Sequence, residues 1–435
     1  MKQLIWLSTL ALLAPAVAFA QQRSPVVTGA AQGVDTLRVT RQQAIAAALR
    51  ANPLLEVARE QTAQVRAQRV QGNAIPDPVA SASYDGQTEF LRFGTAAART
   101  VNVQLGLPFP DKFRLRNQIG TANVLASEAQ LRLAGQTIAA QAGRSYDSVL
   151  VTRMHRRNLI DTRDLAADFL KKTQARFDAG TVPRLDVIRA QTDLAQAEND
   201  LIGNSRDVAN ADAALNRVLG RPLGSPVAPL DSLEAPPSLP DLAWLEQRAL
   251  STRPEIAAIE SQQRAAHANS LLVKENAFLP DLNFGANRDY AQDVGTLYSA
   301  GLSLPLPVFF WQHSRGEFAE SKHRELELAA SARDVRAAVG QDVRAAFATA
   351  DAALRQATFI RDQLLPSASE AYRVATVSYG LGGLSALDVL QARRTLIDAQ
   401  RQYADALAAA NSARSDLERA AASPLSSFQP GAPRE

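Results

Sequence analysis

The chain has 435 residues, of which 46% are hydrophobic, 6% are aromatic and none is Cys. The apolar fraction supports a folded core and excludes wholesale disorder. The absence of Cys excludes disulfides, thiolate metal sites and a cysteine nucleophile, and we therefore also expect no lipid-modified N-terminus. Lys and Arg number 47 against 44 Asp and Glu, so the balanced charge indicates no nucleic-acid partner. Many Ala and few aromatic residues favour long helices over a compact enzyme.

Residues 1–20 have the pattern of a secretory signal peptide. A Lys near the start precedes a largely apolar run, and an Ala-Phe-Ala cleavage site ends at residue 20. No later stretch holds 18 consecutive apolar residues, so we expect no membrane-spanning helix. The sequence predicts an exported protein with a loose N-terminal loop at 21–36 and a flexible tail at 422–435.

The second half of the chain repeats the first at an offset of about 202 residues. The matching segments, in the same order, are Asn52-Pro53 with Arg253-Pro254, Ile75-Pro76-Asp77 with Leu279-Pro280-Asp281, Leu107-Pro108-Phe109-Pro110 with Leu304-Pro305-Leu306-Pro307, and Phe177-x-x-Gly180-x-x-x-x-Leu185-Asp186-Val187 with Tyr379-x-x-Gly382-x-x-x-x-Leu387-Asp388-Val389. Residues 220–240 are rich in Pro and form a linker between the two repeats, 37–219 and 241–421.

Each repeat is expected to contain three helices. They span residues 41–73, 111–178 and 184–219 in the first half, and 241–278, 311–378 and 386–421 in the second. Thr40 and Gln43 form a capping box at the start of the first helix. The long helix spans roughly 100 Å and matches the other two laid end to end, so each half is an antiparallel pair with one continuous strut. Pro366 should kink the second long helix.

The last helix of each half carries an apolar residue at every seventh position. These ladders are Val187, Leu194, Leu201, Val208 and Leu215, and Val389, Leu396, Tyr403, Ala410 and Leu417. Ile188 and Ile202, with Leu390 and Ile397 in the second half, widen the stripe. A sustained repeat of this period predicts coiled-coil packing against a neighbouring helix.

Two extended segments precede each long helix and alternate between apolar and polar residues. Val101, Val103, Leu105 and Leu107 alternate with polar residues, as do Tyr298, Ala300, Leu302 and Leu304, and Leu282 and Phe284. The pattern suits strands of a membrane β-barrel and also suits a surface strand of a soluble sheet. Four strands cannot close a barrel, and a bilayer tolerates no open edge, so several chains must contribute; three would supply twelve strands.

With these features together, the sequence resembles the TolC-like outer membrane efflux family, from Leu37 to about Ala421. The resemblance implies a mainly helical fold with membrane β-strands: a homotrimer with a shared 12-stranded β-barrel in outer membrane lipid and an α-helical coiled-coil barrel in the periplasm. It implies a periplasmic adaptor protein and an inner-membrane pump as partners, no cofactor and no catalysis. Pro76-Asp77-Pro78 and the Leu304–Phe309 run are similar to the heavy-metal efflux branch, whose pumps are of the RND type.

The turns between the long and last helices are the candidate functional region. Gly180 and Gly382 permit the reversal and would form the tip at which an adaptor docks. Asp186 and Asp388 begin the ascending helices. Each is either a capping carboxylate, as the spacing of Ser385 and Asp388 suggests, or part of a ring at a closed periplasmic mouth, where three-fold symmetry would gather three copies.

The family resemblance gives Asp388 more weight than Asp186, because the second helix pair is the mobile one in the family. It also implies that Tyr379 and Arg393 bond across helices to keep the mouth shut. The family often has a second acidic residue three positions after Asp388, where this chain has Gln391.

The sequence offers no metal-binding or catalytic pattern. The chain has four histidines, and no two of them are three or four residues apart, the spacing that would place two metal ligands on one face of a helix: His155, His267, His313 and His323. No nucleophile–base–acid set stands out. The primary hypothesis is an outer membrane efflux channel for metal cations or small toxic compounds. The alternatives are a polypeptide-secretion duct of the same fold and a periplasmic coiled-coil scaffold or adaptor.

Overall fold

The computed structural model describes residues 36–86, 97–236, 238–291, 294–306 and 308–423. These residues belong to one unit of the fold, which begins at Thr36. The expected signal peptide lies outside the described residues, as do most of the N-terminal loop and the tail beyond Ser423.

The first predicted helix is two helices, α1 (Arg41–Ala51) and α2 (Pro53–Gly72). The capping box of Thr40 and Gln43 is confirmed. The prediction of one continuous helix was wrong, because a proline disfavours the helical conformation of the residue before it. Asn52 is extended, with φ −70° and ψ 124°, and its Nδ2 donates to the carbonyl oxygen of Val218 at 2.8 Å.

The same break divides the predicted helix 241–278 into α5 (Leu242–Thr252) and α6 (Pro254–Phe278). Arg253 precedes the proline and is extended, with φ −64° and ψ 126°. Its Nη1 donates to the carbonyl oxygens of Arg419 and Ala420 at 3.3 and 3.1 Å. Both breaks therefore place a side-chain donor on the terminal carbonyls of a distant helix, which lack partners within that helix.

The first long helix, α3 (Pro110–Asp178), is continuous over 69 residues. Its counterpart is α7 (Phe310–Phe359), followed by a π-helical turn, η2 (Ile360–Leu364), and α8 (Leu365–Gly380). Near Pro366, where a kink was expected, the structure has a widened π-helical turn just before the proline. A proline inside a helix removes a hydrogen bond and crowds the carbonyl one turn earlier, and the π turn relieves both.

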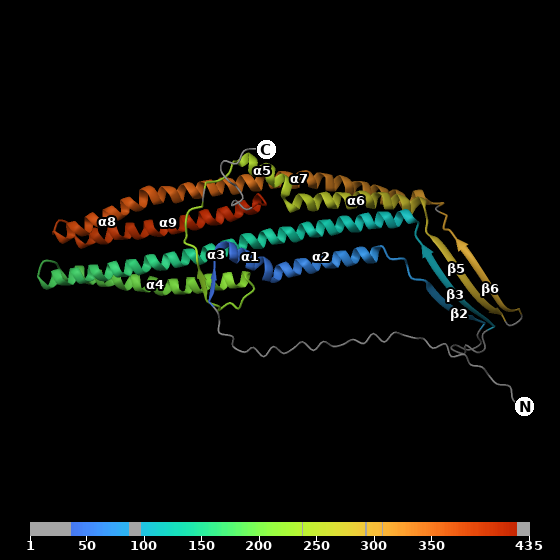
Figure 1. The fold of residues 1–435 in the computed structure, drawn as a ribbon, viewed down its shortest axis with the longest axis horizontal. Coiled ribbons are helices and arrows are strands. Elements are labelled where there is room, and N and C mark those ends of the chain that lie inside the picture. Colours follow the sequence, from blue (N-terminus) through green and yellow to red (C-terminus); the bar gives the residue numbers. More distant parts are fainter. Residues whose placement is uncertain (1–35, 87–96, 237, 292–293, 307, 424–435) are drawn as a thin grey trace, which may run out of the picture. The chain divides into compact units, whose positions relative to one another are not determined.

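The last helices are α4 (Arg184–Val218) and α9 (Ala386–Ala420). The helix α3 packs against α1 and α2 and then against α4, while α9 packs against α7 and α8. The expected pairing of a continuous strut with stacked helices is confirmed for α3, and in the second half α5, α6 and α9 pack against α7, the first part of the interrupted long helix (Figure 1). Contacts of α3 with α6 and α9 join the two halves side by side.

The residues of the predicted ladders are buried or half-buried, but the residues beside them differ in burial between α4 and α9. Val187 and Leu215 of α4 and every ladder residue of α9 except the half-buried Tyr403 are buried. Leu390 of α9 is also buried, whereas Ile188 and Ile202 of α4 are 47% and 71% exposed. The expectation that these two isoleucines widen the packed stripe was therefore wrong within a single chain.

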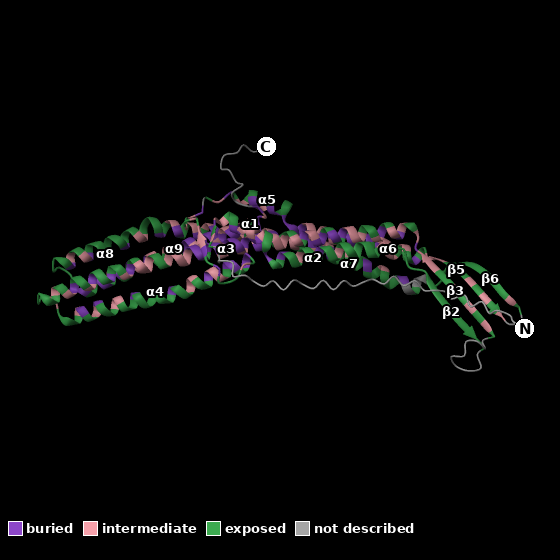
Figure 2. Cartoon of the chain, turned by 60° about the horizontal axis from the view of Figure 1, so that its bottom comes forward, coloured by how far each residue is buried: buried purple, intermediate pink, exposed green. Residues whose placement is uncertain are grey.

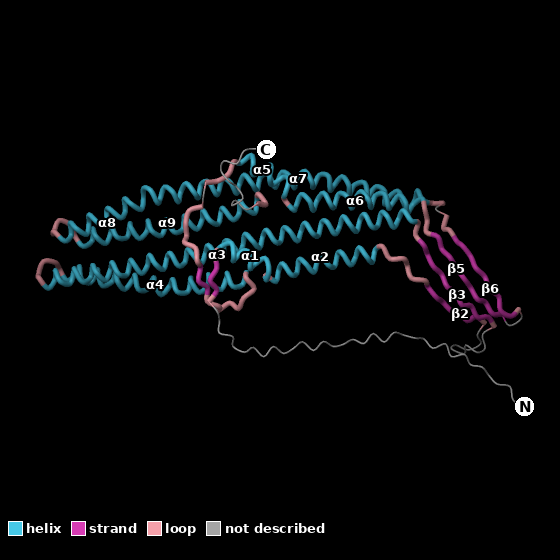
Figure 3. Tube along the Cα trace, viewed as in Figure 1, coloured by secondary structure: helices cyan, strands magenta, loops and turns pink. Residues whose placement is uncertain are grey.

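Four strands form one antiparallel sheet in the order β2 (Val79–Asp85), β3 (Ala98–Leu107), β5 (Leu282–Ala291) and β6 (Gly295–Ser303) (Figure 3). The expected extended segments are confirmed as these strands. The pairing of β3 with β5 brings strands from the two halves of the chain together.

A second, two-stranded sheet was not predicted. The strand β1 (Leu37–Val39) pairs in parallel with β4 (Val227–Pro229), which lies within the Pro-rich linker. Tyr146 of α3 supports this sheet, because its hydroxyl donates to the carbonyl oxygen of Val39 at 2.9 Å. Burial raises the pKa of Tyr146 to about 12. Part of the linker is thus an ordered element of the core.

Buried residues are concentrated where α1, α3, α4 and the small sheet meet (Figure 2). Arg41 lies at the edge of this core. Its Nε donates to Asp147 of α3 at 3.2 Å, its Nη2 donates to Ser415 of α9 at 2.6 Å, and its backbone N–H donates to Asp231 of the linker at 2.6 Å. One residue thus connects the first helix, the linker and both halves.

Candidate functional site

Two sharp turns close the helical hairpins at one end of the bundle. Gly180, between α3 and α4, has φ +73°, and Gly382, between α8 and α9, has φ +82°. In each turn the residue after the glycine donates to a carbonyl five residues back, Thr181 to Arg176 and Gly383 to Ser378. This hydrogen-bond pattern defines the helix-ending motif in which glycine adopts the left-handed conformation.

The two turns lie close together. A hydrophobic cluster near them joins Phe169 of α3, Ala190 of α4, Ala375 and Tyr379 of α8, and Val389 of α9. The two hairpins are therefore packed against each other near their tips, as the adjoining ribbons also show (Figure 1).

Tyr379 is buried between the hairpins. Its hydroxyl lies 3.4 Å from Thr173 Oγ1, and its ring centroid lies 5.4 Å from that of Phe169. The guanidinium of Arg176 lies 4.4 Å from the Tyr379 ring and donates to the Tyr379 carbonyl oxygen. The tyrosine of the second half is thus held by three residues of α3.

Arg393 of α9 is also buried and forms an ion pair with Asp193 of α4. Burial, together with the charge of neighbouring Arg394, lowers the pKa of Arg393 to about 10. Sequence reasoning identified Tyr379 and Arg393 but missed Thr173, Arg176 and Asp193. Their positions carry no motif, so only packing reveals them as partners.

Asp388 is exposed and caps α9. It accepts hydrogen bonds from the backbone N–H and hydroxyl of Ser385 at 2.9 and 2.7 Å, and its own N–H donates to Ser385 Oγ. These bonds lower the pKa of Asp388. Asp186 instead pairs with Arg189 one turn along α4, at 3.5 Å. Among the described residues, neither carboxylate bonds to Tyr379 or Arg393.

The four-stranded sheet has one apolar and one polar face. Its register places Ala80, Ala82, Val101, Val103, Leu105, Leu107, Leu282, Phe284, Ala286, Ala300 and Leu302 on one face. The other face carries Ser81, Ser83, Thr100, Asn102, Gln104, Asn283, Asn287, Asp289, Ser299 and Ser303. Within the described part of the chain, β2 and β6 each pair with one strand, so both outer edges are open.

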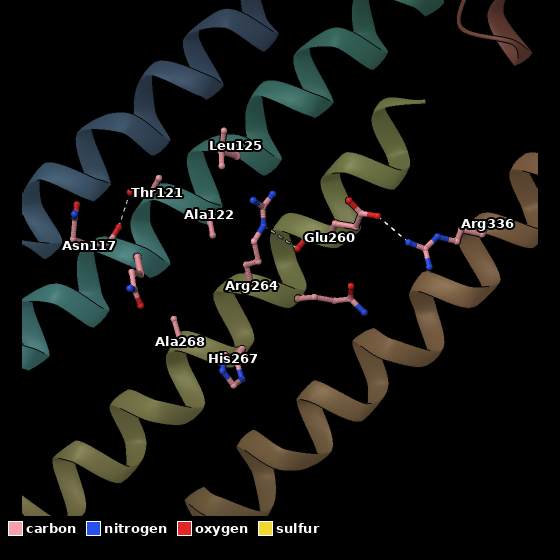
Figure 4. Close-up of a pocket in the computed structure, with 11 residues that line it drawn as sticks. Asn117, Thr121, Ala122, Leu125, Glu260, Arg264, His267, Ala268 and Arg336 are labelled. Carbon is pink, nitrogen blue, oxygen red and sulfur yellow. Dashed lines mark hydrogen bonds and ion pairs between the residues drawn. The ribbon is translucent and has the colours of Figure 1, made fainter. Parts of the chain in front are cut away.

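A groove of about 900 Å³ lies between α3, α6 and α7 (Figure 4). Glu260 of α6 pairs with Arg336 of α7 at 2.8 Å, and Arg264 donates to Ser261 at 2.8 Å. Thr121 donates to the carbonyl oxygen of Asn117, one turn back on α3. These polar groups of the groove are therefore paired already, either within one helix or between α6 and α7.

The described residues contain no group of three or more His, Asp or Glu side chains placed to hold a metal ion.

No helix in the described ranges is sufficiently long and apolar to cross a membrane.

Comparisons with known proteins agree with this architecture. The model of the outer membrane efflux protein family matches residues 18–221 and 245–423, and the chain belongs to this family. It is 26% identical over 422 residues to the cobalt-zinc-cadmium resistance protein CzcC of Cupriavidus metallidurans, covering 94% of this chain and 96% of the relative. It is also 26% identical over 337 residues to the outer membrane efflux protein BepC of Brucella suis, covering 74% and 72%.

Two solved structures share the fold. The transmembrane channel CusC superposes with a TM-score of 0.74 at 20% identity, covering 89% of this chain and 93% of CusC. The outer-membrane channel OprN superposes with a TM-score of 0.73 at 18% identity, covering 88% and 89%.

The protein is therefore an outer membrane channel of a tripartite efflux system and not an enzyme. It extends from the outer membrane into the periplasm and works with an adaptor and an inner-membrane pump. The expectation of an efflux channel is confirmed, and the alternative of a periplasmic scaffold was wrong.

Proposed function

We propose that three copies of this chain form one channel with a shared twelve-stranded β-barrel and a tunnel of helices below it. The observation that carries this proposal is the four-stranded sheet, because the face that carries Ala80, Val103 and Leu302 is largely apolar and the described outer edges are open. A bilayer core offers no water to unpaired backbone groups, so spanning strands must close into a barrel. Four strands are too few, and copies of the same sheet complete it.

Exposed apolar residues on α4 support the same assembly. Leu185, Ile188 and Ile202 are 52%, 47% and 71% exposed in the single chain. In α9 the counterparts of Ile188 and Ile202 are covered by their own chain, since Leu390 is 6% exposed and Ala404 is fully buried, whereas Leu387, the counterpart of Leu185, is 54% exposed. Burying the α4 residues against a neighbouring subunit would remove apolar surface from water, which stabilises the trimer.

The turns of the two hairpins form the periplasmic mouth in this proposal. Gly180 and Gly382 shape the tips on which the adaptor docks. The exposed carboxylate of Asp388 and the half-buried carboxylate of Asp186 contribute charge around the mouth, and three-fold symmetry multiplies each by three. Tyr379 and Arg393 hold the second hairpin against the first, so breaking their contacts opens the mouth.

The cargo is proposed to be metal cations or small toxic compounds, delivered by an adaptor and a pump of the RND type. The support is the similarity to the cobalt-zinc-cadmium resistance protein over nearly the full length of both chains. The Pro76-Asp77-Pro78 segment agrees with the same branch. Selectivity then belongs to the pump, and the channel conducts what the pump delivers.

Deletion and complementation test this function. Cells lacking the protein should become sensitive to zinc, cobalt or cadmium salts, or to small toxic compounds, and the intact chain should restore resistance. The restored protein should fractionate with outer membranes as a heat-sensitive oligomer of three chains. If the deletion leaves sensitivity unchanged but abolishes secretion of a polypeptide, the cargo proposal is wrong and the channel is a polypeptide-secretion duct. A monomer in the outer membrane would contradict the trimer.

A further inference from the structure

The two open edges of the four-stranded sheet correspond, through the internal repeat, to the two strands that pair at its centre. The Ile75-Pro76-Asp77 segment before β2 matches Leu279-Pro280-Asp281 before β5, so these two strands are equivalent. Each forms an antiparallel hairpin with the strand that follows it, so β3 and β6 are equivalent as well. Within the chain, β3 pairs with β5. Their equivalents are β6 and β2, the edge strands of the sheet (Figure 3).

Asp85 on the edge strand β2 is the equivalent of Asp289 on β5. Each aspartate lies the same number of residues after the Pro-Asp segment that precedes its strand. At the centre of the sheet, Asp289 accepts a hydrogen bond from Thr100 Oγ1 of β3 at 2.7 Å. Asp85 is exposed, and it lies on the same polar face, because it is two residues from Ser83 in β2. The open edge of β2 therefore carries a carboxylate at the position that is hydrogen-bonded in β5.

Ser299 on the other edge strand, β6, is the equivalent of Thr100 on β3. Thr100 lies opposite Ser83 in the first hairpin, and Ser299 lies opposite Asn287 in the second. Ser83 and Asn287 are equivalent, since each is two residues before the equivalent aspartate of its strand. Ser299 is exposed. The repeat thus puts a hydroxyl on one open edge and a carboxylate on the other, as in the bonded pair at the centre.

We propose that β6 of one copy of this chain pairs with β2 of a second copy in the register of β3 with β5, and that Ser299 donates a hydrogen bond to Asp85 of the partner subunit. An edge strand presents unpaired N–H and C=O groups, and in the bilayer core only another strand satisfies them. The proposal rests on the proposed barrel and adds the register at which neighbouring copies join.

Both faces of the sheet favour this register. On the apolar face it places Leu302 opposite Ala82 of the partner subunit, as Val103 lies opposite Ala286 at the centre. A slip of one residue would turn the apolar residues of one strand onto the polar face. A slip of two residues would keep the faces but would separate the hydroxyl from the carboxylate.

Disulfide cross-linking measures this register, because the native chain contains no Cys. Directly opposite residues of antiparallel strands have Cα atoms about 4.5–5.5 Å apart, within reach of a disulfide. Within one chain, β3 and β5 separate β2 from β6 by about 14 Å, so a disulfide between these strands joins two copies.

The in-register variants are Ala82→Cys/Leu302→Cys and, for the other hydrogen-bonding class of antiparallel pair, Ser83→Cys/Gly301→Cys. The full-length channels are oxidised in outer membranes and analysed on boiled, non-reducing gels. At least one variant should convert most of its chains into covalent dimers and trimers. Ala82→Cys/Ala300→Cys is the matched control, shifted by two residues along β6. Diagonal Cα atoms lie about 7–8 Å apart, so its cross-linking should fall about fivefold or more.

The hydrogen bond has its own test. Ser299→Ala should lower the temperature at which the oligomer dissociates on gels, because the donor to Asp85 is lost at every junction. Ser299→Thr restores a hydroxyl and should retain the native temperature. Native heat stability in Ser299→Ala would overturn the proposed bond.

The register itself is overturned by an oligomer that cross-links through the shifted pair as well as through the in-register pairs, or by one that forms no in-register cross-link. If the native chain forms no oligomer, the proposed barrel fails instead, and an unboiled gel of the native chain shows that separately.

Discussion

Arg393 of α9 forms a buried ion pair with Asp193 of α4, 200 residues away in sequence. Arg393 is 2% exposed, and its Nε and Nη1 have no hydrogen-bond partner among the described residues. Asp193 is therefore the group that compensates this buried charge. The two hairpins are tied together at this point, next to the cluster that holds Tyr379.

Asp193→Asn should loosen the tip. The change leaves the Arg393 charge buried without its counter-ion, a loss that typically costs about 3–5 kcal/mol. We expect trimers to persist and conductance in planar bilayers to rise several-fold. Asp168→Asn is the matched control, because Asp168 pairs with Lys172 on α3 with both side chains more than half exposed. Native conductance in Asp193→Asn would show that the pair does not restrain the mouth.

Asp388→Ala combined with Tyr379→Phe should leave trimers intact but leaky. The double variant removes the exposed carboxylate and the tyrosine hydroxyl that lies near Thr173. Planar-bilayer conductance is the measurement, and a native value would contradict the gate assignment. Ser385→Ala separates two roles of Asp388, because it removes the hydroxyl of the cap and keeps the carboxylate. A leak in Ser385→Ala as large as in Asp388→Ala would assign Asp388 to capping.

Arg41→Ala should destabilise the protein in a pH-dependent way. Burial raises the pKa of Asp147 above its usual value even with Arg41 beside it. Folding therefore disfavours the charged carboxylate, and losing Arg41 raises that pKa further. The destabilisation should reach about 3 kcal/mol near neutral pH and shrink in acid, where Asp147 is protonated.

Thermal unfolding of the purified channel at pH 5 and pH 8 measures this effect. The double variant Arg41→Ala/Asp147→Asn is the control, because it has no carboxylate at position 147. Its loss of stability should vary less with pH than that of Arg41→Ala. An equal loss at both pH values in Arg41→Ala would contradict the argument.

Ala422→Gly should stabilise the protein by about 0.5–1 kcal/mol. Ala422 follows α9 with φ +51°, a left-handed conformation that is strained for alanine, whereas Gly220 occupies the corresponding position after α4 with φ +67°. The reverse change, Gly220→Ala, should destabilise, because an added Cβ would lie 2.5 Å from the Ala51 carbonyl oxygen. Melting temperatures should move in opposite directions, and a parallel shift would contradict the comparison.

Ile202→Glu should weaken the trimer. The proposed subunit interface covers Ile202, which is 71% exposed in the single chain, and burying an unpaired carboxylate there is unfavourable. The fraction of heat-sensitive oligomer on gels should fall at least several-fold. Ile202→Val keeps the apolar contact and should retain the oligomer. An unaffected oligomer in Ile202→Glu would place this face of α4 outside the interface.

The local elements of this protein could be read from its sequence because short-range interactions determine them. The Thr40 cap, the glycine turns and the alternation in β3 each depend on residues only a few positions apart, and all were confirmed. The Asn52-Pro53 and Arg253-Pro254 matches were noticed in the sequence. Their effect on the helices was missed, although the conformational preference before proline is itself local.

The tertiary structure decided which distant groups meet. Nothing near Arg393 in the sequence indicates Asp193 as its partner, and nothing near β1 indicates that β4 in the linker would pair with it. The alternation of the strands predicted two-faced segments, but only the register of β3 with β5 placed Thr100 opposite Asp289. Such contacts depend on how long helices and strands pack as whole bodies, so residues about 200 positions apart become neighbours only in the folded chain.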